Sequence, residues 1–356
     1  MKNSSKWIIR SCLISFILII TMLTGVGTQA GEESLVLTEI GQFIGIEKAV
    51  DVQIVGNVAY VVDLRNGLKI VDITDSTNLS LVGAYHKRGY THNVVVDGDR
   101  AYMSETASGL AILDVRDPTN PTKLGQFTES RAINVDVVGD IVYVPGHNEG
   151  LHIINVTDPS NPTTLGQYSE GGVITSVCVA EDIAYVDQQH PDNFSLMILD
   201  VSDPTNPIKL GQYDREETSS PYVVNIQIIE DIAYVANWLN GLEIFNISDP
   251  TNPIKLGQYN SYLGNTMDVQ VVGEVAYISD GIEGLKILDV SDPKNITEVG
   301  AFKDGAEAFG IYVVEDIVYV ADGSDGLEVI KVEREIQNAS GWTVLIFGTT
   351  LMTILL

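Results

Sequence analysis

Short apolar runs separated by turn-forming residues are the dominant pattern of the chain. One representative stretch places such runs at 93–96, 101–104, 110–115 and 122–127, with Gly, Asp, Asn and Pro between them. β-Branched and aromatic residues fill the runs, as is typical of strands that are half or fully buried. The pattern predicts four short strands joined by tight turns in this stretch.

The four-strand pattern recurs along the chain, and one tyrosine marks each copy. This tyrosine follows Ala or Val in the second predicted strand and returns at intervals of 41 to 49 residues. The marked positions are Tyr60, Tyr102, Tyr143, Tyr185, Tyr234, Tyr277 and Tyr319. A strand-rich repeat of about 40–45 residues is the signature of propeller blades, each a four-stranded sheet. We therefore expect an all-β fold, a seven-bladed β-propeller.

A twelve-residue phrase, SDPTNPIKLGQY, occurs at 202–213 and again, unchanged, at 248–259. It spans the predicted turn from the third to the fourth strand. In the corresponding DPTNP of the second copy, Pro118 and Pro121 fix φ and remove backbone donors, while Asp117 and Asn120 can bond to their own backbone. The phrase is expected to form a rigid outer corner that most blades reuse.

The two ends of the repeat region complement each other. The seventh copy stops after its third strand, at 326–333, and no LGQY-type strand follows it. An unpaired strand of that type, LTEIGQF at 37–43, precedes the first copy. If this N-terminal strand completes the seventh blade, the ring closes and no sheet edge is left open. We expect a closed, monomeric ring over residues 31–336.

Both termini are hydrophobic and lie outside this ring. Residues 1–30 join a basic stretch, an apolar run and the sequence TQA, which is the order of a secretory signal peptide with cleavage after Ala30. Residues 341–356 carry no charge. This run is somewhat shorter than the roughly 20 residues of a spanning helix. We interpret 337–356 as a C-terminal hydrophobic helix that serves as a membrane anchor or sorting tail. The protein is therefore expected to be secreted and held at the cell surface.

The charge of the chain excludes two classes of partner. The formal net charge is −28, and loss of the three cations in residues 1–30 would move it to −31. Such a surface repels nucleic acid phosphates and anionic lipid headgroups. We expect no nucleic acid partner, and contact with a membrane only through the C-terminal segment.

The segments GLKIVDITD, GLAILDVRDP and GLKILDVSDP, which begin at Gly67, Gly109 and Gly284, resemble the LVIVD repeat. This motif is found in exported bacterial and archaeal β-propellers. The first copy lacks the prolines of the turn, the fourth lacks the Gly before Leu196, and the seventh lacks the Asp-Pro turn. The resemblance implies a secreted or surface propeller and no common reaction, because a fold does not give function.

Candidate metal ligands fall into two sets of positions expected near the axis. No G-x-S-x-G, H-E-x-x-H or cysteine-pair motif is present. One set begins the innermost strands and contains Asp51 and Asp268; the other follows each repeat tyrosine and contains Asp63, Asp280 and Asp322. These carboxylates could converge on a hard cation such as Ca²⁺. Alternatively, Asp and Asn at these positions cap turns and bond to neighbouring blades.

Four loop residues are candidates for a ligand-binding face: His92, Tyr222, Trp238 and Tyr262. Exposed aromatic residues with polar neighbours suit a peptide or a glycan. Each aromatic could instead be a wedge between blades. By contrast, His152 takes a position expected to face solvent, which Lys69, Glu243 and Lys286 occupy in other copies.

These features favour a non-catalytic interaction module that binds an extracellular protein or carbohydrate. A first alternative is a calcium-dependent hydrolase or lyase that uses Asp51, Asp268 and Asp280, in which the cation acts as a Lewis acid beside a carboxylate. A second alternative is a structural component of a surface layer.

Overall fold

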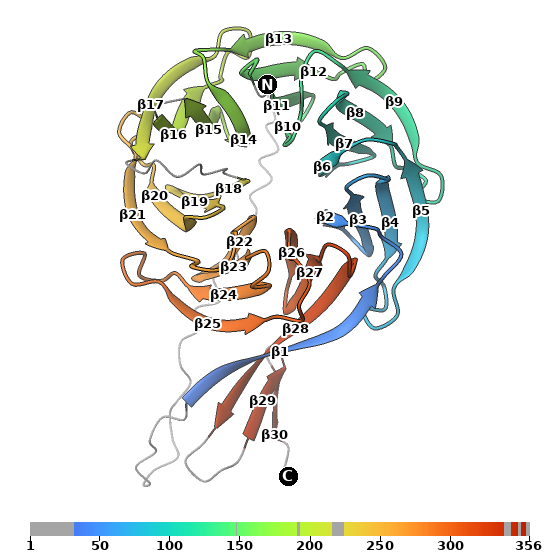
Figure 1. The fold of residues 1–356 in the computed structure, drawn as a ribbon, viewed down its shortest axis with the longest axis vertical. Coiled ribbons are helices and arrows are strands. Elements are labelled where there is room, and N and C mark those ends of the chain that lie inside the picture. Colours follow the sequence, from blue (N-terminus) through green and yellow to red (C-terminus); the bar gives the residue numbers. More distant parts are fainter. Residues whose placement is uncertain are drawn as a thin grey trace, which may run out of the picture.

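The structure, a computed structural model, describes residues 32–146, 148–190, 193–215, 224–337, 343–347 and 350–353. The chain forms a ring of seven sheets around a central axis, with one strand of each sheet nearest the axis (Figure 1). This confirms the predicted seven-bladed β-propeller. The proposed signal peptide, residues 1–30, lies outside the described residues.

Each blade is an antiparallel sheet whose strands follow one another from the axis outward. Blades 1 to 3 consist of β2 (Ala49–Val55), β3 (Val58–Asp63), β4 (Gly67–Asp72) and β5 (Ser80–His86); β6 (Thr91–Asp97), β7 (Arg100–Glu105), β8 (Gly109–Asp114) and β9 (Thr122–Phe127); and β10 (Asp136–Val138), β11 (Ile141–Pro145), β12 (Leu151–Asn155) and β13 (Thr163–Tyr168). Blades 4 to 6 consist of β14 (Val173–Ala180), β15 (Ile183–His190), β16 (Asn193–Asp200) and β17 (Ile208–Arg215); β18 (Asn225–Ile229), β19 (Ile232–Asn237), β20 (Gly241–Asn246) and β21 (Ile254–Tyr259); and β22 (Asp268–Val272), β23 (Val275–Ser279), β24 (Leu285–Asp289) and β25 (Thr297–Phe302).

Blade 7 is built from both ends of the ring region. It contains β26 (Gly310–Val314), β27 (Ile317–Ala321) and β28 (Leu327–Gln337), and its outer strand is β1 (Glu32–Phe43). The register pairs Phe43 with Leu327 and Leu37 with Val332. Figure 1 shows β1 lying along β28. The expected closure by the N-terminal strand is confirmed.

The far end of β28 carries an additional hairpin. Strands β29 (Thr343–Phe347) and β30 (Thr350–Thr353) extend the sheet, with Gln337 paired to Thr343. These strands cover only 343–347 and 350–353, and the hydrophobic helix expected for 337–356 stays a prediction. None of the described segments is a helix with the length and apolarity needed to cross a membrane. The membrane-anchor hypothesis stays a prediction.

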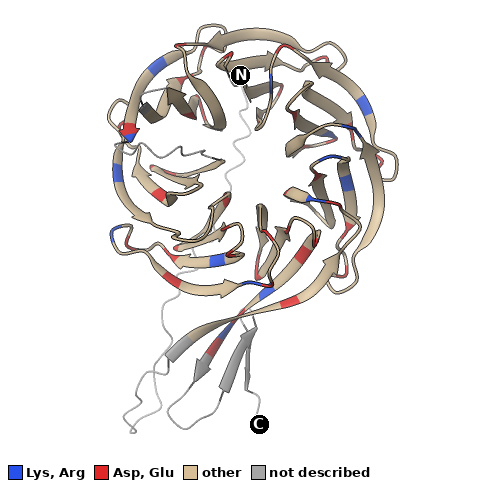
Figure 2. Cartoon of the chain, viewed as in Figure 1, with Lys and Arg blue, Asp and Glu red and all other residues tan. Residues whose placement is uncertain are grey.

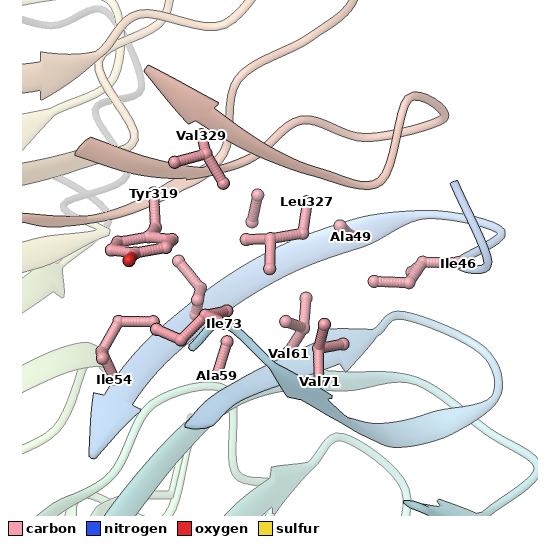
Figure 3. Packing of buried hydrophobic residues seen from close by; sticks show 12 residues of the cluster. Ile46, Ala49, Ile54, Ala59, Val61, Val71, Ile73, Tyr319, Leu327 and Val329 are labelled. Atoms are coloured by element: carbon pink, nitrogen blue, oxygen red, sulfur yellow. The ribbon is translucent and has the colours of Figure 1, made fainter. Parts of the chain in front are cut away.

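The hydrophobic core lies between adjacent blades. The repeat tyrosines pack there: Tyr60 joins residues of blades 1 and 2, and Tyr319 joins residues of blades 7 and 1. At the second of these interfaces, Leu327 and Val61 are fully buried in the cluster shown in Figure 3. The same kind of packing therefore holds the closing interface and the other interfaces together.

The duplicated phrase contains both partners of a contact between blades. In blade 2, Asp117 accepts hydrogen bonds from the backbone N (3.0 Å) and hydroxyl (2.6 Å) of Thr119, which shapes the predicted outer corner. The Gly of each LGQ segment then lies against the corner of the next blade. A Cβ on Gly125 would stand 1.9 Å from the carbonyl oxygen of Pro159, and one on Gly257 1.5 Å from that of Pro293.

This contact also occurs at the closure, where a Cβ on Gly41 would lie 2.0 Å from the carbonyl oxygen of Ser76. The exception is Gly300 of blade 6, which faces Leu37, because blade 7 has no Asp-Pro corner. The phrase repeats, we conclude, because each copy must receive the corner of the next blade and offer its own corner to the previous one.

Candidate functional site

A pocket of about 320 Å³ lies on the axis, on the side where the innermost strands begin. Two consecutive residues from most blades line it; the first is apolar or aromatic in every blade except blade 4, where it is Thr175, and the second is small or polar. The first kind comprises Val50, His92, Ile133, Thr175, Val224, Met267 and Phe309, and the second Asp51, Asn93, Asn134, Asn225, Asp268 and Gly310. The second kind belongs to the set of positions at the start of the innermost strands in which the sequence analysis placed Asp51 and Asp268.

The polar residues of the pocket are tied into a belt between blades. Asp51 accepts hydrogen bonds from the backbone N of Val94 and the side-chain amide of Asn93 in the next blade, both at 2.8 Å. Asp268 accepts one from the backbone N of Ile311, also at 2.8 Å. Asn134 repeats the contact with the backbone N of Val177 at 3.1 Å. These bonds match the structural alternative in the sequence analysis, in which Asp and Asn bond to neighbouring blades.

Blade 7 interrupts the belt and brings two carboxylates close together. Gly310 has no side chain to offer, and a Cβ there would lie 3.1 Å from Oδ1 of Asp51. Burial raises the pKa of Asp51 to about 6. Burial and the charge of Asp51 raise the pKa of Asp268 to about 8. Near neutral pH the pair therefore carries about one negative charge.

Trp238 lines the pocket with a strained backbone. Its φ is +29°, in the left-handed region that residues with a side chain rarely adopt. The equivalent residues of blades 6 and 7, Gly281 and Gly323, have φ of 54° and 50° and no such restriction. Strain of this kind persists at sites where the side chain is needed. The conformation therefore marks Trp238 as a functional candidate.

Lys48, His92 and Phe309 complete the wall of the pocket. The Lys48 ammonium lies 4.3 Å from the centre of the Phe309 ring and 3.4 Å from a carboxylate oxygen of Glu307, so its charge is already engaged. Burial lowers the pKa of His92, which keeps its imidazole neutral at physiological pH. The ring of His92 also stacks with Tyr90, with centroids 6.4 Å apart.

Large apolar side chains are exposed in the loops of blades 5 and 6, next to Trp238. Tyr262 is 93% exposed and Leu263 74%, while Leu239 and Ile282 are about half exposed. A bridge between Trp238 and Thr266 brings these loops together. Tyr262 thus stands at the surface near the pocket without lining it. Tyr222, the remaining aromatic candidate, lies outside the described residues.

The other candidate metal ligands do not join Asp51 and Asp268. Asp63 accepts a hydrogen bond from the side-chain amide of Asn66 at 3.1 Å and supports its own loop. Asp280 lies 3.2 Å from the Lys286 ammonium and also accepts a hydrogen bond from Thr266 at 2.9 Å. The five carboxylates are therefore distributed over separate local arrangements.

Asp322 belongs to a different acidic group in blade 7. Its carboxylate and those of Asp304, Asp325 and Glu328 have oxygens within 4.8 Å of one another. Glu328, Asp304 and Asp325 were not identified from the sequence. A comparison of third-strand positions across the copies would have found Glu328, because Lys69 and Lys286 stand at that position in blades 1 and 6.

That third-strand position is also where the sequence analysis was wrong. His152, Lys69 and Glu243 were expected to face solvent, yet they are 4%, 9% and 1% exposed. Residues of the preceding blade contact this row: Phe127 of β9 packs against His152, and Arg215 of β17 binds Glu243. Alternation along one strand does not reveal such packing. Charges at this position therefore require partners.

Acidic residues outnumber basic residues in the ring, and both kinds are distributed over the blades (Figure 2). One fully buried cation, Arg215, links blades 4 and 5 by contacts of 2.6 Å to Asp187 and 2.8 Å to Glu243. Where a buried acid lies at an interface in these blades, a basic side chain neutralises it.

Comparisons with known proteins agree with this architecture. The family model described as LVIVD repeat matches six consecutive segments, residues 47–87, 88–129, 130–170, 171–215, 222–261 and 263–304. No curated protein matches the chain in sequence. The six segments correspond to blades 1 to 6, and the blade shared by the two chain ends is left unmatched.

Two solved structures illustrate the likeness in fold. The computationally designed Ika8 protein matches with a TM-score of 0.61 and 9% identity over 82% of this chain and 99% of that chain. Virginiamycin B lyase from Staphylococcus aureus matches with a TM-score of 0.63 and 12% identity over 85% of this chain and 99% of that chain. At such identities the similarity concerns the fold alone.

Proposed function

The chain belongs to the LVIVD-repeat family of β-propeller proteins, and from this premise we propose that it is a non-catalytic binding module whose axial pocket receives a basic side chain of a partner protein. The observation that carries this proposal is the pair Asp51 and Asp268 in a pocket with largely apolar walls. An Arg or Lys side chain has matching parts, an aliphatic stem and a cationic end.

The electrostatics of the pocket support a cationic guest. The raised pKa values of Asp51 and Asp268 show that ionisation of both is unfavourable in the free protein. A guanidinium or ammonium group between them would favour the ionised form of each. Trp238 adds an aromatic ring, and such rings attract cations within about 6 Å, whereas the Phe309 ring already carries the Lys48 ammonium. A basic group is therefore complementary to the acids and to the Trp238 ring.

The size of the pocket and the net charge of the chain also support a basic side chain as the guest. A volume of about 320 Å³ is at the lower end for small-ligand sites, so it suits one side chain better than an extended ligand. The net charge of −28 attracts basic partners over a distance and accelerates their encounter. The apolar side chains at Tyr262 and Leu263 provide a surface beside the pocket for the rest of the partner.

The test uses the full chain and an acetylated, amidated Gly-Arg-Gly tripeptide, with a Gly-citrulline-Gly tripeptide as the uncharged control of equal shape. We expect calorimetry to show saturable binding of the first peptide only. The Asp51→Asn, Asp268→Asn double variant should weaken binding about tenfold or more. In blades 2 and 3 the position equivalent to Asp51 and Asp268 is already an asparagine, Asn93 and Asn134. The double variant therefore places a residue there that this fold accommodates.

Other outcomes would contradict the proposal. Equal binding of the citrulline peptide, or unchanged binding by the double variant, would exclude recognition of a cation. Binding of saccharides that depends on Trp238 but not on the two acids would favour a carbohydrate partner instead. If neither peptide nor saccharide binds, the axial pocket is not a recognition site of this kind.

A metal-dependent hydrolase or lyase at the same pocket is the second candidate. The fold likeness to a lyase and the acid pair beside a neutral His92 support it. However, Asp51 and Asp268 each already accept two backbone N–H groups, which reduces their capacity to bind a metal ion. Calcium binding that is lost in the Asp51→Asn, Asp268→Asn variant, while peptide binding is absent, would favour the enzyme.

We also propose that the protein is exported and acts at the cell surface. The signal-peptide pattern of residues 1–30 and the apolar tail of residues 341–356 support this location. Cell fractionation with an antibody against the ring tests it, because recovery of the uncleaved chain in the soluble cytoplasmic fraction would contradict it.

A further inference from the structure

The acidic group of blade 7 lies away from the axial pocket and has its own geometry. Asp322 follows β27, Asp325 is in the next turn, Glu328 is on β28 and Asp304 is in the loop that enters the blade. The turn is held by hydrogen bonds from the backbone N of Asp322 to the oxygen of Gly326 (2.8 Å) and from the backbone N of Asp325 to the oxygen of Asp322 (2.9 Å). The four carboxylates are therefore positioned by ordered backbone.

Two of these carboxylates have oxygens that are buried without a partner. Asp322 and Glu328 are 3% and 2% exposed, and Oδ2 of Asp322 and Oε1 of Glu328 accept no hydrogen bond. A buried acceptor without a partner destabilises the fold unless another group satisfies it. The group therefore contains two buried acceptors that a bound cation would satisfy.

Blade 6 shows what the same positions contain when they are neutralised. Its turn has the same two hydrogen bonds, from the backbone N of Asp280 to Gly284 and from that of Glu283 to Asp280. Ser261 donates a hydrogen bond to Asp280, and Lys286 lies 3.2 Å from it. The four positions equivalent to Asp304, Asp322, Asp325 and Glu328 are therefore Ser261, Asp280, Glu283 and Lys286. In blade 6 the cation belongs to the chain itself.

In blade 5 the buried acid is neutralised by Arg215 of blade 4 and also from its own outer strand. Glu243, at the position of Glu328, lies 2.7 Å from the Lys255 ammonium. The strand registers pair Glu243 with Gln258 and Glu328 with Gln42, so the residue equivalent to Lys255 is Glu39. Blade 7 consequently has an acid at both positions from which blades 5 and 6 supply a lysine.

We propose that Asp304, Asp322, Asp325 and Glu328 bind a calcium ion, which takes the place that the Lys286 ammonium occupies in blade 6. Carboxylates grouped in this way, without His or Cys, are the ligands of a hard cation. Ca²⁺ accepts six to eight oxygens in flexible geometry, whereas Mg²⁺ demands a strict octahedron and retains its water. Exposed Asp304 and half-buried Asp325 leave a path for the ion to enter.

The ion would act on the blade that closes the ring. It would connect three segments: the loop that enters from blade 6, the turn after β27, and strand β28. Strand β28 in turn pairs with the N-terminal strand β1. Calcium would therefore stabilise the closing blade specifically. This inference is independent of the axial pocket, since it shares no residue with the Asp51 and Asp268 pair.

The test is a calcium titration of the full chain after treatment with a chelator, followed by calorimetry and thermal unfolding. We expect one ion per chain and an unfolding temperature that rises with free calcium, as binding to the native state requires. Magnesium should bind at least tenfold more weakly. Asp325→Asn should lower the calcium affinity about tenfold or more, because it removes one charged ligand.

The decisive variant is Glu328→Lys, which gives blade 7 the lysine of blade 6. We expect it to fold without calcium, to lose calcium binding and to show an unfolding temperature that no longer depends on the ion. Asp292→Asn, in an outer corner of blade 6, is the matched control and should bind calcium as the wild type does. If Glu328→Lys does not fold, Asp325→Asn and Asp304→Asn still test the site.

The proposal is overturned if the chelated chain shows no saturable calcium binding. It is also overturned if Asp325→Asn and Asp304→Asn bind calcium as tightly as the wild type. Loss of binding in the Asp51→Asn, Asp268→Asn variant but not in these two would place the ion in the axial pocket. Peptide binding at the pocket is measured separately, so failure of one proposal leaves the other distinguishable.

Discussion

Replacing Asp268 by Asn should make the ring more stable at alkaline pH. Burial and the neighbouring Asp51 raise the pKa of Asp268 to about 8. An unfolded chain would release this proton near pH 3.9. The folded protein therefore holds the proton more tightly, so this group stabilises the fold fully below about pH 4, and the contribution is lost as the pH rises toward 8. Asn has no charge to lose and should be free of this effect.

The shift in the pKa of Asp268 gives the magnitude of the expected change in stability. A difference of four pKa units corresponds to roughly 5 kcal/mol, at about 1.4 kcal/mol per unit. Relaxation around the ionised carboxylate reduces this, so we expect Asp268→Asn to be about 2–5 kcal/mol more stable than the wild type at pH 9. At pH 4.5 the variant should be equal or slightly less stable, because Asn accepts one of the two backbone hydrogen bonds that Asp268 accepts now.

The assay is thermal unfolding of both proteins between pH 4.5 and pH 9. For a ring of this size the expected gain corresponds to an unfolding temperature higher by about 4–10 °C at pH 9. Asp136→Asn is the matched control, since burial also raises the pKa of Asp136 but no second carboxylate contributes. Its gain should have the same sign and be smaller. Parallel pH profiles for Asp268→Asn and the wild type would refute the reasoning.

Three further substitutions, with Ile254→Ala as a control, test the packing and the pocket. Gly125→Ala should destabilise the ring by about 1–3 kcal/mol in urea unfolding, because its Cβ would lie 1.9 Å from the carbonyl oxygen of Pro159; an unchanged midpoint would show that the contact is easily relaxed. Leu327→Ala should cost about 2–5 kcal/mol at the closing interface, whereas Ile254→Ala on the exposed outer strand should change stability by less than about 0.5 kcal/mol. Trp238→Gly should relieve a φ of +29° and leave stability equal or about 1 kcal/mol higher while peptide binding is lost; a clear loss of stability would make Trp238 a wedge between blades.

The architecture could be predicted because its determinants are local and repeated. The strands expected at 101–104 and 110–115 are β7 and β8, and the strand expected at 122–127 is β9 to the residue. The closure by 37–43 was also predictable, since a missing outer strand and an unpaired strand of the same type occur at opposite ends of one repeat array. Alternation and turn chemistry carry this information without any knowledge of tertiary contacts.

The candidate site was only partly predictable. The position of Asp51 and Asp268 near the axis followed from their place in each copy, and the pocket confirms that placement. The partners of the other acids did not follow, because they come from different strands: Lys286 pairs with Asp280, while Asp322 meets Asp304 and Glu328. Repeat spacing shows in which blade a residue lies and at which position of its strand, but it does not identify the residue that it contacts.

The sequence by itself determined the number of blades, the order of strands, the corner shaped by Asp117 and the use of the N-terminal strand, because each depends on residues that are near neighbours or repeat in register. Only the tertiary structure decided which charges are buried. The side chain of Glu328 is buried and its Oε1 accepts no hydrogen bond, and the calcium ion that we propose there would compensate for that burial. The energy of a carboxylate depends on the groups around it, and in a closed ring those groups come from distant parts of the chain.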